Sequence, residues 1–426
     1  VMLKRHRVSR IYWNRRFFDY PISLSANTFK AMGFKLTMVA GFSYLKSMFH
    51  KLPETSLENF YINRFGRKLY SMFFEGYTEK LWGRHPSQIS ADWGAQRVKG
   101  LSILGVLKNA FRKLSPKKRK GEVETSLIEE FWYPKLGPGQ LWETVERRCV
   151  DAGATVITDA KVVEIRQAQG RIESVVYESS DGKRTELHAD QFISSMPVKD
   201  LVNAIDAASH DDDAEASSAP VPQDMTHIAN GLPYRDFVTV GLLVKHMRLK
   251  NTTDIPTLNP PIVPDCWIYV QDPGYKVGRL QIFNNWSPYL VKDVDDTVWI
   301  GLEYFCNEGD DFWNMTDVEA TKFAISELTR MRVINGPQDV LDSHRERVKK
   351  AYPAYFDTYA QMSELVEYLD SFGNLYCVGR NGQHRYNNMD HSMATAIEAV
   401  ANIKSGKTSK QNVWSVNTDK SYHEQK

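Results

Sequence analysis

The residues of this chain best placed to do chemistry lie in one short segment near its C-terminal end. An apolar run, Leu375–Val378, predicts a buried strand, and Gly379 and Gly382 after it allow the backbone to turn tightly. Arg380 places a cation between those two glycines, and a new helix is predicted from about Met389. This segment suits an anionic or electron-rich cofactor, because a helix N-terminus offers free N–H groups and a positive dipole end. An ordinary strand–turn–helix connection is the alternative.

The predicted helix begins after Asn387 or Asn388, either of which can serve as its N-cap. Its apolar residues recur at helical spacing and predict one buried face. They are Met389, Met393, Ala396, Ile397, Val400 and Ile403.

The order of residues in this segment resembles a known family. Val378-Gly379-Arg380, followed by Tyr386 and Met389-Asp390, is similar to the C-terminal flavin-binding segment of UDP-galactopyranose mutases, although the last pair there is Asp-Met. Two further stretches resemble bacterial FAD-dependent oxidoreductases of the flavin amine oxidase and protoporphyrinogen oxidase group. They are residues 77–83 with 89–93, and residues 133–142. The resemblance runs over most of the chain.

The resemblance implies an α/β (α+β) fold with two lobes, a discontinuous FAD-binding lobe and a substrate lobe with an antiparallel sheet and helices. A chain of 426 residues is also too long for one ordinary core. We expect the helical part of the substrate lobe at 1–130, FAD-binding segments at 131–205 and 346–426, and the substrate-lobe sheet at 206–345.

The coarse pattern along the chain agrees with that division. Helices are predicted at 28–50, with its aromatics in the core, from 57 after a cap at Thr55 or Ser56, at 141–151 and at 316–331. Strands are predicted at 155–158, 161–165, 171–177, 184–188, 191–195, 237–244, 267–271, 279–283 and 297–304, with a hairpin turn at Asp181-Gly182. Residues 206–224 have the composition of a linker. The basic run 113–120 is expected to be a solvated loop, or else a contact to an anionic membrane or a nucleotide sugar.

The resemblance also implies the residues around FAD. Arg380 is the candidate catalytic residue, because a fixed cation beside the flavin ring favours the anionic reduced form. The candidate cofactor-binding residues are Lys135, Gly137, Gly139, Val162, Val163, Ser195, Met196, Pro197, Gly379, Arg380, Asn381, Gly382, Met389, Asp390, Ser392 and Met393. The structural alternative is a salt bridge at a helix end for Arg380 and a plain sheet edge for Val162 and Val163.

Candidate substrate residues lie on or just after strands of the second lobe, where arginine and aromatics suit a phosphate or carboxylate on a flat molecule. They are Arg279, Asn284, Asn285, Trp286 and Tyr304. The alternative is that these side chains simply face solvent. The resemblance leaves three functions open: hydride transfer from substrate to FAD, a non-redox sugar mutase that uses reduced flavin, and a chain without cofactor or activity. The partner would be a small molecule, with a nucleotide sugar among the candidates.

Composition restricts the other classes of function that the chain could have. A net charge of +2 predicts no general attraction to nucleic acid, and no apolar run approaches the ~20 residues of a membrane span. The four cysteines lie far apart and form no C-x-x-C, so we expect reduced thiols in a cytoplasm and no metal site. No nucleophile-elbow or zinc-protease motif occurs, as expected if a cofactor supplies the chemistry.

No G-x-G-x-x-G occurs in the sequence, and Gly137-Pro138-Gly139 is followed three residues later by Trp142. The resembling proteins hold the FAD pyrophosphate with such a turn in an N-terminal βαβ unit. We therefore expect that this sequence begins after that unit. The alternative is that the unit never existed and that FAD binding is lost.

Overall fold

The computed structural model describes residues 1–20, 28, 31–91, 123–124, 130–210, 219–257, 262–417 and 423–424. The chain divides into two compact units. Unit 1 comprises Val1–Ala152, Asp236–Lys349 and Ser421–Lys426, and unit 2 comprises Gly153–Arg235 and Lys350–Lys420. The strands β10 (Tyr234–Val244) and β14 (Val340–Pro353) run across two of the boundaries.

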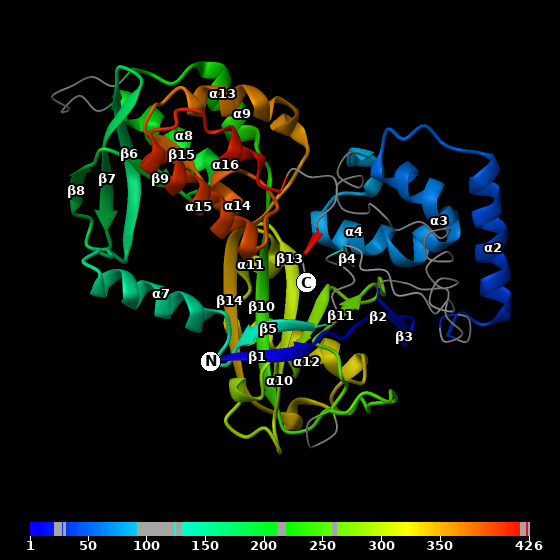
Figure 1. Cartoon of the computed structure of the whole chain (residues 1–426). Helices are drawn as coiled ribbons and strands as arrows, with labels where there is room; N and C mark the ends of the chain where they lie inside the picture. The colour runs from blue at the N-terminus through cyan, green and yellow to red at the C-terminus, as the bar shows by residue number, and fades with distance from the viewer. Residues whose placement is uncertain are drawn as a thin grey trace, which may run out of the picture. The chain divides into compact units, whose positions relative to one another are not determined.

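Unit 1 is built around a seven-stranded sheet in the order β14-β10-β13-β12-β11-β2-β3 (Figure 1). Its remaining strands are β2 (Ser9–Trp13), β3 (Arg16–Asp19), β11 (Trp267–Val270), β12 (Arg279–Ile282) and β13 (Val298–Cys306). Strands β10, β13, β12 and β11 pair antiparallel in turn, while β2 lies parallel to β11. One face of the sheet packs with α12 (Asp317–Arg330) in a core that includes Val240, Ile300 and Leu328. The four strands and the helix predicted between 236 and 344 are confirmed.

Three helices follow the first strands of unit 1: α2 (Phe34–Phe49), α3 (Leu57–Phe73) and α4 (Glu75–Trp82). The predicted cap of α3 is confirmed, because Oγ of Ser56 accepts a hydrogen bond from the Asn59 N–H (3.2 Å). Inside α3, Gly66 has φ 79° and interrupts the helix. Residues 1–130 are not helical throughout, however: β2 and β3 join the sheet, and β1 (Met2–His6) pairs antiparallel with β5 (Glu130–Pro134).

The shorter elements of unit 1 connect these parts. They are the 3₁₀ turns η1 (Pro86–Gln88), η4 (Pro288–Leu290) and η5 (Pro337–Asp339), the helices α7 (Gly139–Asp151), α10 (Phe283–Trp286) and α11 (Asp311–Asn314), and the antiparallel pair β4 (Val123–Glu124) and β16 (His423–Glu424).

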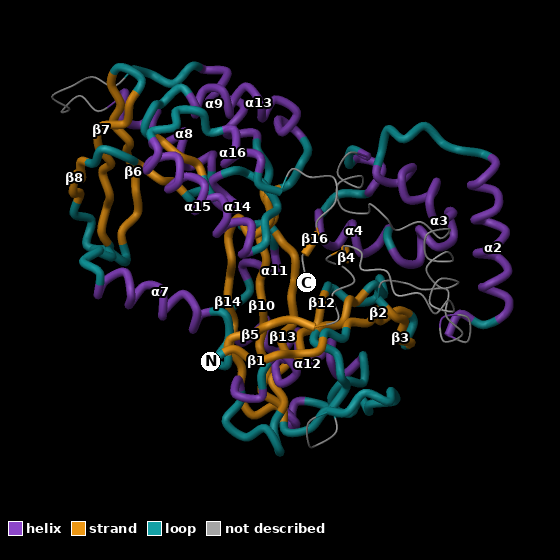
Figure 2. The backbone as a smooth tube through the Cα atoms, viewed as in Figure 1, coloured by secondary structure: helices purple, strands orange, loops and turns teal. Residues whose placement is uncertain are grey.

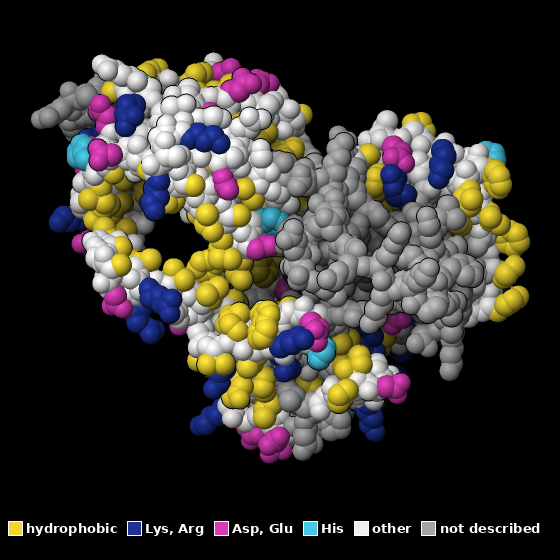
Figure 3. Space-filling view, in the orientation of Figure 1, with side chains coloured by type: hydrophobic (Ala, Val, Ile, Leu, Met, Phe, Trp, Pro, Cys, Tyr) yellow, Lys and Arg dark blue, Asp and Glu magenta, His cyan; other side chains and the backbone are white. Residues whose placement is uncertain are grey.

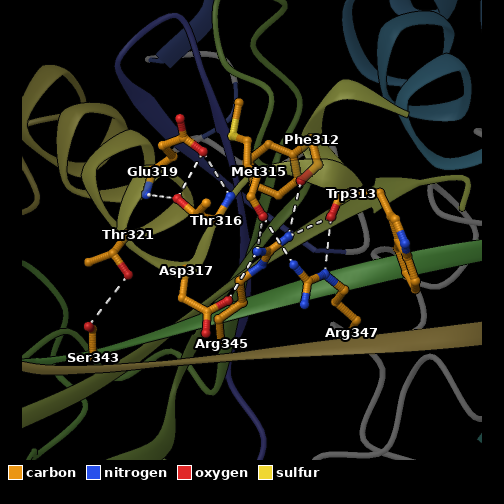
Figure 4. Close-up of polar contacts among 10 residues, drawn as sticks. All are labelled: Phe312, Trp313, Met315, Thr316, Asp317, Glu319, Thr321, Ser343, Arg345 and Arg347. Carbon is orange, nitrogen blue, oxygen red and sulfur yellow. Dashed lines mark hydrogen bonds and ion pairs between the residues drawn. The ribbon is translucent and has the colours of Figure 1, made fainter. Parts of the chain in front are cut away.

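Two arginines of β14 hold the end of α11 (Figure 4). Nη2 of Arg345 donates to the carbonyl oxygens of Phe312 (3.2 Å) and Trp313 (2.8 Å). Arg347 donates to the carbonyl oxygens of Trp313 (3.1 Å) and Met315 (3.0 Å). The last carbonyls of a helix have no partner within it, so these cations complete the hydrogen bonding of α11.

Unit 2 combines a three-stranded antiparallel sheet with a parallel pair of strands and several helices (Figure 2). The sheet is β6 (Ala160–Ala168), β7 (Arg171–Ser179) and β8 (Arg184–His188), and the parallel pair is β9 (Phe192–Ser194) with β15 (Leu375–Cys377). The helical elements are α8 (Val198–Ala207), η3 (Ala208–His210), α9 (Gln223–Gly231), η6 (Asp357–Gln361), α13 (Met362–Asp370), α14 (Gly379–Gly382), α15 (Met389–Ser405) and α16 (Gln411–Ser415). Leu201, Ile228 and Leu365 lie in its core.

The unit boundaries differ from the predicted segments. Residues 131–152, assigned above to the FAD-binding lobe, belong to unit 1, where β5 pairs with β1. Residues 206–235, assigned to the substrate lobe, belong to unit 2, because Met225 and Ile228 of α9 pack into its core. The predicted strand at 155–158 is absent, since these residues are exposed and pair with no described strand. The acidic part of the predicted linker and the basic run 113–120 lie outside the described residues.

Over the described residues, the structure contains no helix long and apolar enough to cross a bilayer. The same residues contain no group of three or more His, Cys, Asp or Glu side chains that could hold a metal ion. All four cysteines are free thiols.

Candidate functional site

The predicted strand, turn and helix of residues 375–405 form as expected. β15 pairs in parallel with β9, and the Val378 N–H donates to the Ser194 carbonyl oxygen (2.9 Å). The chain then makes the short helical turn α14, and the buried Gly379 N–H donates to Oγ1 of Thr395 (2.9 Å). Asn388 immediately precedes α15, and its N–H donates to Nδ1 of His391 (3.1 Å). The end of a strand and the N-terminus of a helix therefore meet at one glycine turn.

The two glycines of the turn are required for different reasons. Gly379 has φ 75°, in the left-handed region that other residues rarely adopt. A Cβ at Gly382 would lie 2.7 Å from the Ser194 carbonyl oxygen and 3.2 Å from Cα of Ser195. Gly382 thus lets the turn pack directly on the backbone at the end of β9. Gly382 is predicted above to allow a tight turn and to bind the cofactor; the structure gives it a packing role as well, and brings it together with the predicted site residue Ser195.

Arg380 is partly buried and fastens three segments of unit 2. Its Nε donates to the Asn387 carbonyl oxygen and its Nη1 to the Ala351 carbonyl oxygen, both at 2.8 Å. The guanidinium carbon lies 4.7 Å from the ring centre of Tyr386 and 5.6 Å from that of Tyr352. Among the described residues no carboxylate pairs with Arg380, so the salt bridge considered as its structural alternative does not form there. The site contains a fixed cation whose charge these residues do not neutralise.

Several buried polar atoms in and beside this turn have no hydrogen-bond partner among the described residues. They are Oγ of Ser194, Oδ1 of Asn381, Oε1 of Gln383, Nδ1 of His384 and Nδ2 of Asn387. Buried polar groups are nearly always hydrogen-bonded, and a cluster of exceptions calls for a polar group that would satisfy them. The turn between β15 and α15 therefore has unused donors and acceptors.

His384 is one of the members of this cluster that sequence reasoning missed, together with Ser194 and Gln383. It is fully buried, and Nε2 lies 3.0 Å from the Ala354 carbonyl oxygen. That nitrogen must carry the proton, because a carbonyl only accepts, so Nδ1 is left as a free acceptor. Burial lowers the pKa of His384 to about 4, against the smaller raising effect of the Ala354 carbonyl. The ring is therefore neutral near pH 7. In the sequence, the only signal for His384 as a site residue is its position in a polar stretch after a glycine turn.

The apolar face predicted for α15 is not buried. Met389, Met393, Ile397 and Val400 are exposed, with exposed fractions between 38% and 67%. The helix packs instead through Ala399 and through polar side chains, since Thr395 bonds Gly379 and Asn402 donates to the Ser409 carbonyl oxygen (3.1 Å). This corrects the predicted orientation of the helix. Met389, Asp390 and Met393 are exposed at its N-terminal end, and Oγ of Ser392 donates back to the Asn388 carbonyl oxygen (3.2 Å).

Other predicted cofactor residues of unit 2 lie at the ends of strands. Val162 pairs with Tyr177, but the register shifts between Val162 and Glu164, so Val163 stands at a bulge. Ser195, Met196 and Pro197 connect β9 to α8, the same connection that Gly382 contacts. Their predicted role toward FAD stays a prediction.

The loop of Lys135, Gly137 and Gly139 belongs to unit 1. Gly137 has φ 88°, and the Lys135 carbonyl oxygen accepts a hydrogen bond from Oγ of Ser287 (2.6 Å). Nζ of Lys135 lies 4.1 Å from the ring centre of Tyr289. These contacts fix the loop within unit 1 and leave its predicted role toward FAD a prediction.

Three predicted substrate residues are structural. Tyr304 is fully buried against α12, and burial raises the pKa of its hydroxyl well above the usual value. Asn284 donates to the Thr297 carbonyl oxygen (2.9 Å), and Asn285 donates to the carbonyl oxygens of Val263 and Asp265 (2.7 Å each). These side chains are buried and occupied inside the unit, and their assignment as substrate contacts stays a prediction.

Arg279 and Trp286 lie on the opposite face of the sheet. Arg279 donates through Nε to Oε2 of Glu303 (2.7 Å), which balances its charge. Trp286 stacks on Trp267, with ring centres 5.3 Å apart, and its indole N–H donates to the Cys266 carbonyl oxygen (3.0 Å). Both stay candidates for substrate contact.

No protein-family model matches this sequence, and no curated protein sequence matches it. Solved structures do match. A reduced UDP-galactopyranose mutase aligns over 99% of this chain and 84% of its own, with a TM-score of 0.74 and 18% identity. A proposed protoporphyrinogen oxidase from Exiguobacterium sp. 255-15 aligns over 94% and 81%, with a TM-score of 0.59 and 13% identity. A putrescine oxidase variant with redesigned cofactor binding aligns over 94% and 83%, with a TM-score of 0.53 and 11% identity. The chain has the mixed α/β fold of these proteins, which confirms at the level of the fold the resemblance expected from the sequence.

Proposed function

We propose that this chain is an FAD-dependent oxidoreductase that takes a hydride from a small-molecule substrate, as in the flavin amine oxidase and protoporphyrinogen oxidase group that its sequence resembles. The observation that carries the proposal is the junction of β15, α14 and α15. An un-neutralised cation, a helix N-terminus and several unpartnered buried polar atoms meet there. Its fold neighbours, which include a putrescine oxidase variant, support the same class.

The residues at this junction fit a flavin. Asn381, His384 and Asn387 would offer acceptors and a donor to its polar edge, and the first N–H groups of α15 point out of the same end of the helix. Arg380 would hold positive charge near the ring, since hydrogen bonds to two carbonyls and cation–π contacts with two aromatic rings fix its guanidinium. When bound, FAD would supply hydride acceptance, and the protein would position it and tune its electronics.

A second function is a non-redox sugar mutase of the UDP-galactopyranose mutase type. Two observations favour it: the match to the mutase structure has a TM-score of 0.74 against 0.59 for the proposed protoporphyrinogen oxidase, and the segment from Gly379 to Asp390 resembles that family's. In this case the substrate would be a nucleotide sugar, and the flavin would end each turnover in the redox state in which it began.

The two functions are separated by one assay. Reduced protein is incubated without oxygen with UDP-galactopyranose, and the sugar products are separated by chromatography while flavin absorbance is followed. Ring-contracted product with unchanged flavin redox state supports the mutase. No product, together with flavin reduction when oxidised protein meets an amine or another oxidisable substrate, supports the oxidoreductase. Protein that neither contains nor takes up flavin supports the third possibility, a chain without cofactor.

We also propose a cytoplasmic location, which the four free thiols support.

A further inference from the structure

The outer face of α2 carries a row of large apolar side chains that are exposed, here named the apolar ridge. Phe34, Met38, Phe42, Leu45 and Phe49 follow one another at intervals of three or four residues, the spacing of one face of a helix. Their exposed fractions lie between 43% for Met38 and 83% for Phe34. In Figure 1, α2 is the outermost helix of the group α2–α4, and Figure 3 shows apolar side chains along its outer side.

The ridge does not result from loose packing of the helix. The opposite face of α2 is held against α3, where a Cβ at Gly66 would lie 2.7 Å from the backbone nitrogen of Tyr44. Oγ of Ser43 also accepts a hydrogen bond from the Lys68 N–H (3.0 Å), and Ala40 is buried. Because the inner face is fixed this closely, the helix cannot roll to bury its apolar side. We predicted that these aromatics belong to the core, and the exposed fractions show that this prediction is wrong.

The charges within residues 34–51 have one sign. Residues 34–51 contain no Asp or Glu, whereas Lys35 and Lys46 lie on α2 and are followed by His50 and Lys51. Lys35 and Lys46 are exposed and form no ion pair with the described residues. Phenylalanine and leucine on one face with lysine beside them are typical of a helix that lies in a membrane interface. The lysine stems can extend along apolar surface while their ammonium groups reach anionic headgroups.

A second copy of the chain fits this face less well. A helix of 16 residues is about 24 Å long and about 10 Å wide, so its face offers roughly 240 Å², against about 800 Å² per partner in a stable complex. Two copies would also bring uncompensated lysines toward one another. We propose that α2 docks on the surface of an anionic lipid bilayer, with the apolar ridge inserted among the headgroups. The proposal rests on α2 alone and is independent of the proposed function.

The proposal is tested by flotation of the purified protein with vesicles of phosphatidylcholine alone and of phosphatidylcholine mixed with phosphatidylglycerol. We expect binding to the anionic vesicles that weakens as salt is raised. The double variant Phe42→Asp/Phe49→Asp should lower the binding constant by at least about tenfold, because both side chains would leave the bilayer. The double variant Lys35→Gln/Lys46→Gln should lose the preference for the anionic vesicles. The control Val318→Asp, at a side chain 62% exposed on α12, should bind like the wild type.

Circular dichroism verifies that each variant keeps its fold, which the exposure of the substituted side chains predicts. A wild-type protein that floats with neither vesicle overturns the proposal, as does Val318→Asp losing as much binding as the ridge variant. Sedimentation velocity without lipid gives the third readout. A wild-type dimer that Phe42→Asp/Phe49→Asp dissociates would assign the ridge to a contact between copies and would also overturn the proposal.

Discussion

The contact of Gly382 with the end of β9 makes a quantitative prediction about the candidate site. In Gly382→Ala the new Cβ would lie 2.7 Å from the Ser194 carbonyl oxygen, which is backbone and cannot rotate away. Overpacking of this kind costs about 1–3 kcal/mol. The same carbonyl accepts the Val378 N–H at 2.9 Å, and weakening that hydrogen bond adds about 1 kcal/mol. The free energy of unfolding should therefore fall by about 2–4 kcal/mol.

Two other glycines of unit 2 separate this steric effect from simple backbone strain. Gly406 has φ 67°, and apart from its chain neighbours no group of the described residues lies within 4 Å of the position that an alanine Cβ would take. Gly406→Ala should therefore cost only about 1 kcal/mol for a left-handed alanine. Gly379 has φ 75°, and among the described residues its new Cβ would meet Ser392 alone, at 3.9 Å, so Gly379→Ala should cost a similar amount. The assay is urea unfolding of all three variants, followed by circular dichroism with the same slope fitted throughout.

The result should rank Gly382→Ala well below the other two variants in stability. It should also lower the flavin content of the purified protein, since the turn must move away from Ser194 and Ser195, whereas Gly406→Ala should keep it. A Gly382→Ala protein as stable as Gly406→Ala would refute the close backbone contact. A stable protein with full flavin content would remove the turn from the candidate site.

Arg380→Gln should make the flavin potential more negative, because a cation near the ring is lost. It should also lower the free energy of unfolding by about 1–3 kcal/mol, because the carbonyls of Asn387 and Ala351 lose a charged donor. An unchanged potential in spectroelectrochemistry would leave Arg380 only a structural role. The pKa of His384 is lowered to about 4, below its unfolded value, so its contribution of roughly 3 kcal/mol should be present above about pH 6.5 and be lost as the pH falls toward 4. Urea midpoints measured across that range should fall in the wild type and change less in His384→Gln; equal slopes would contradict the neutral buried imidazole. Tyr304→Phe should leave the KM for the substrate unchanged because Tyr304 is in the core, and a raised KM would return it to the substrate site.

The elements of the fold could be predicted wherever a local signal decides them. The strand at 279–282, the Asp181-Gly182 turn and the Ser56 cap each follow from a few neighbouring residues, and all three are present. The glycine turn after β15 was also predictable, because an apolar run, two glycines and a helix cap follow one another within about 15 residues of the sequence.

Which face of an element packs could not be read from the same pattern. The apolar positions of α15 have helical spacing, yet Thr395 and Asn402 face the unit because their hydrogen bonds fix the helix there. The β-prone run at 297–304 predicts a strand but does not tell which face of that strand meets α12. Tyr304 was therefore predicted as a substrate residue, whereas it lies in the core. His384 was missed because a histidine in a polar loop gives no signal in the sequence that tells whether its imidazole is buried or solvated.

The central claim is that the junction of β15, α14 and α15 holds a flavin. The most direct test is the flavin content of the protein expressed from its complete coding sequence, measured by absorbance and by release of the cofactor on denaturation. We expect about one FAD per chain. A colourless protein that takes up no added FAD, although it is folded by circular dichroism, would contradict the claim.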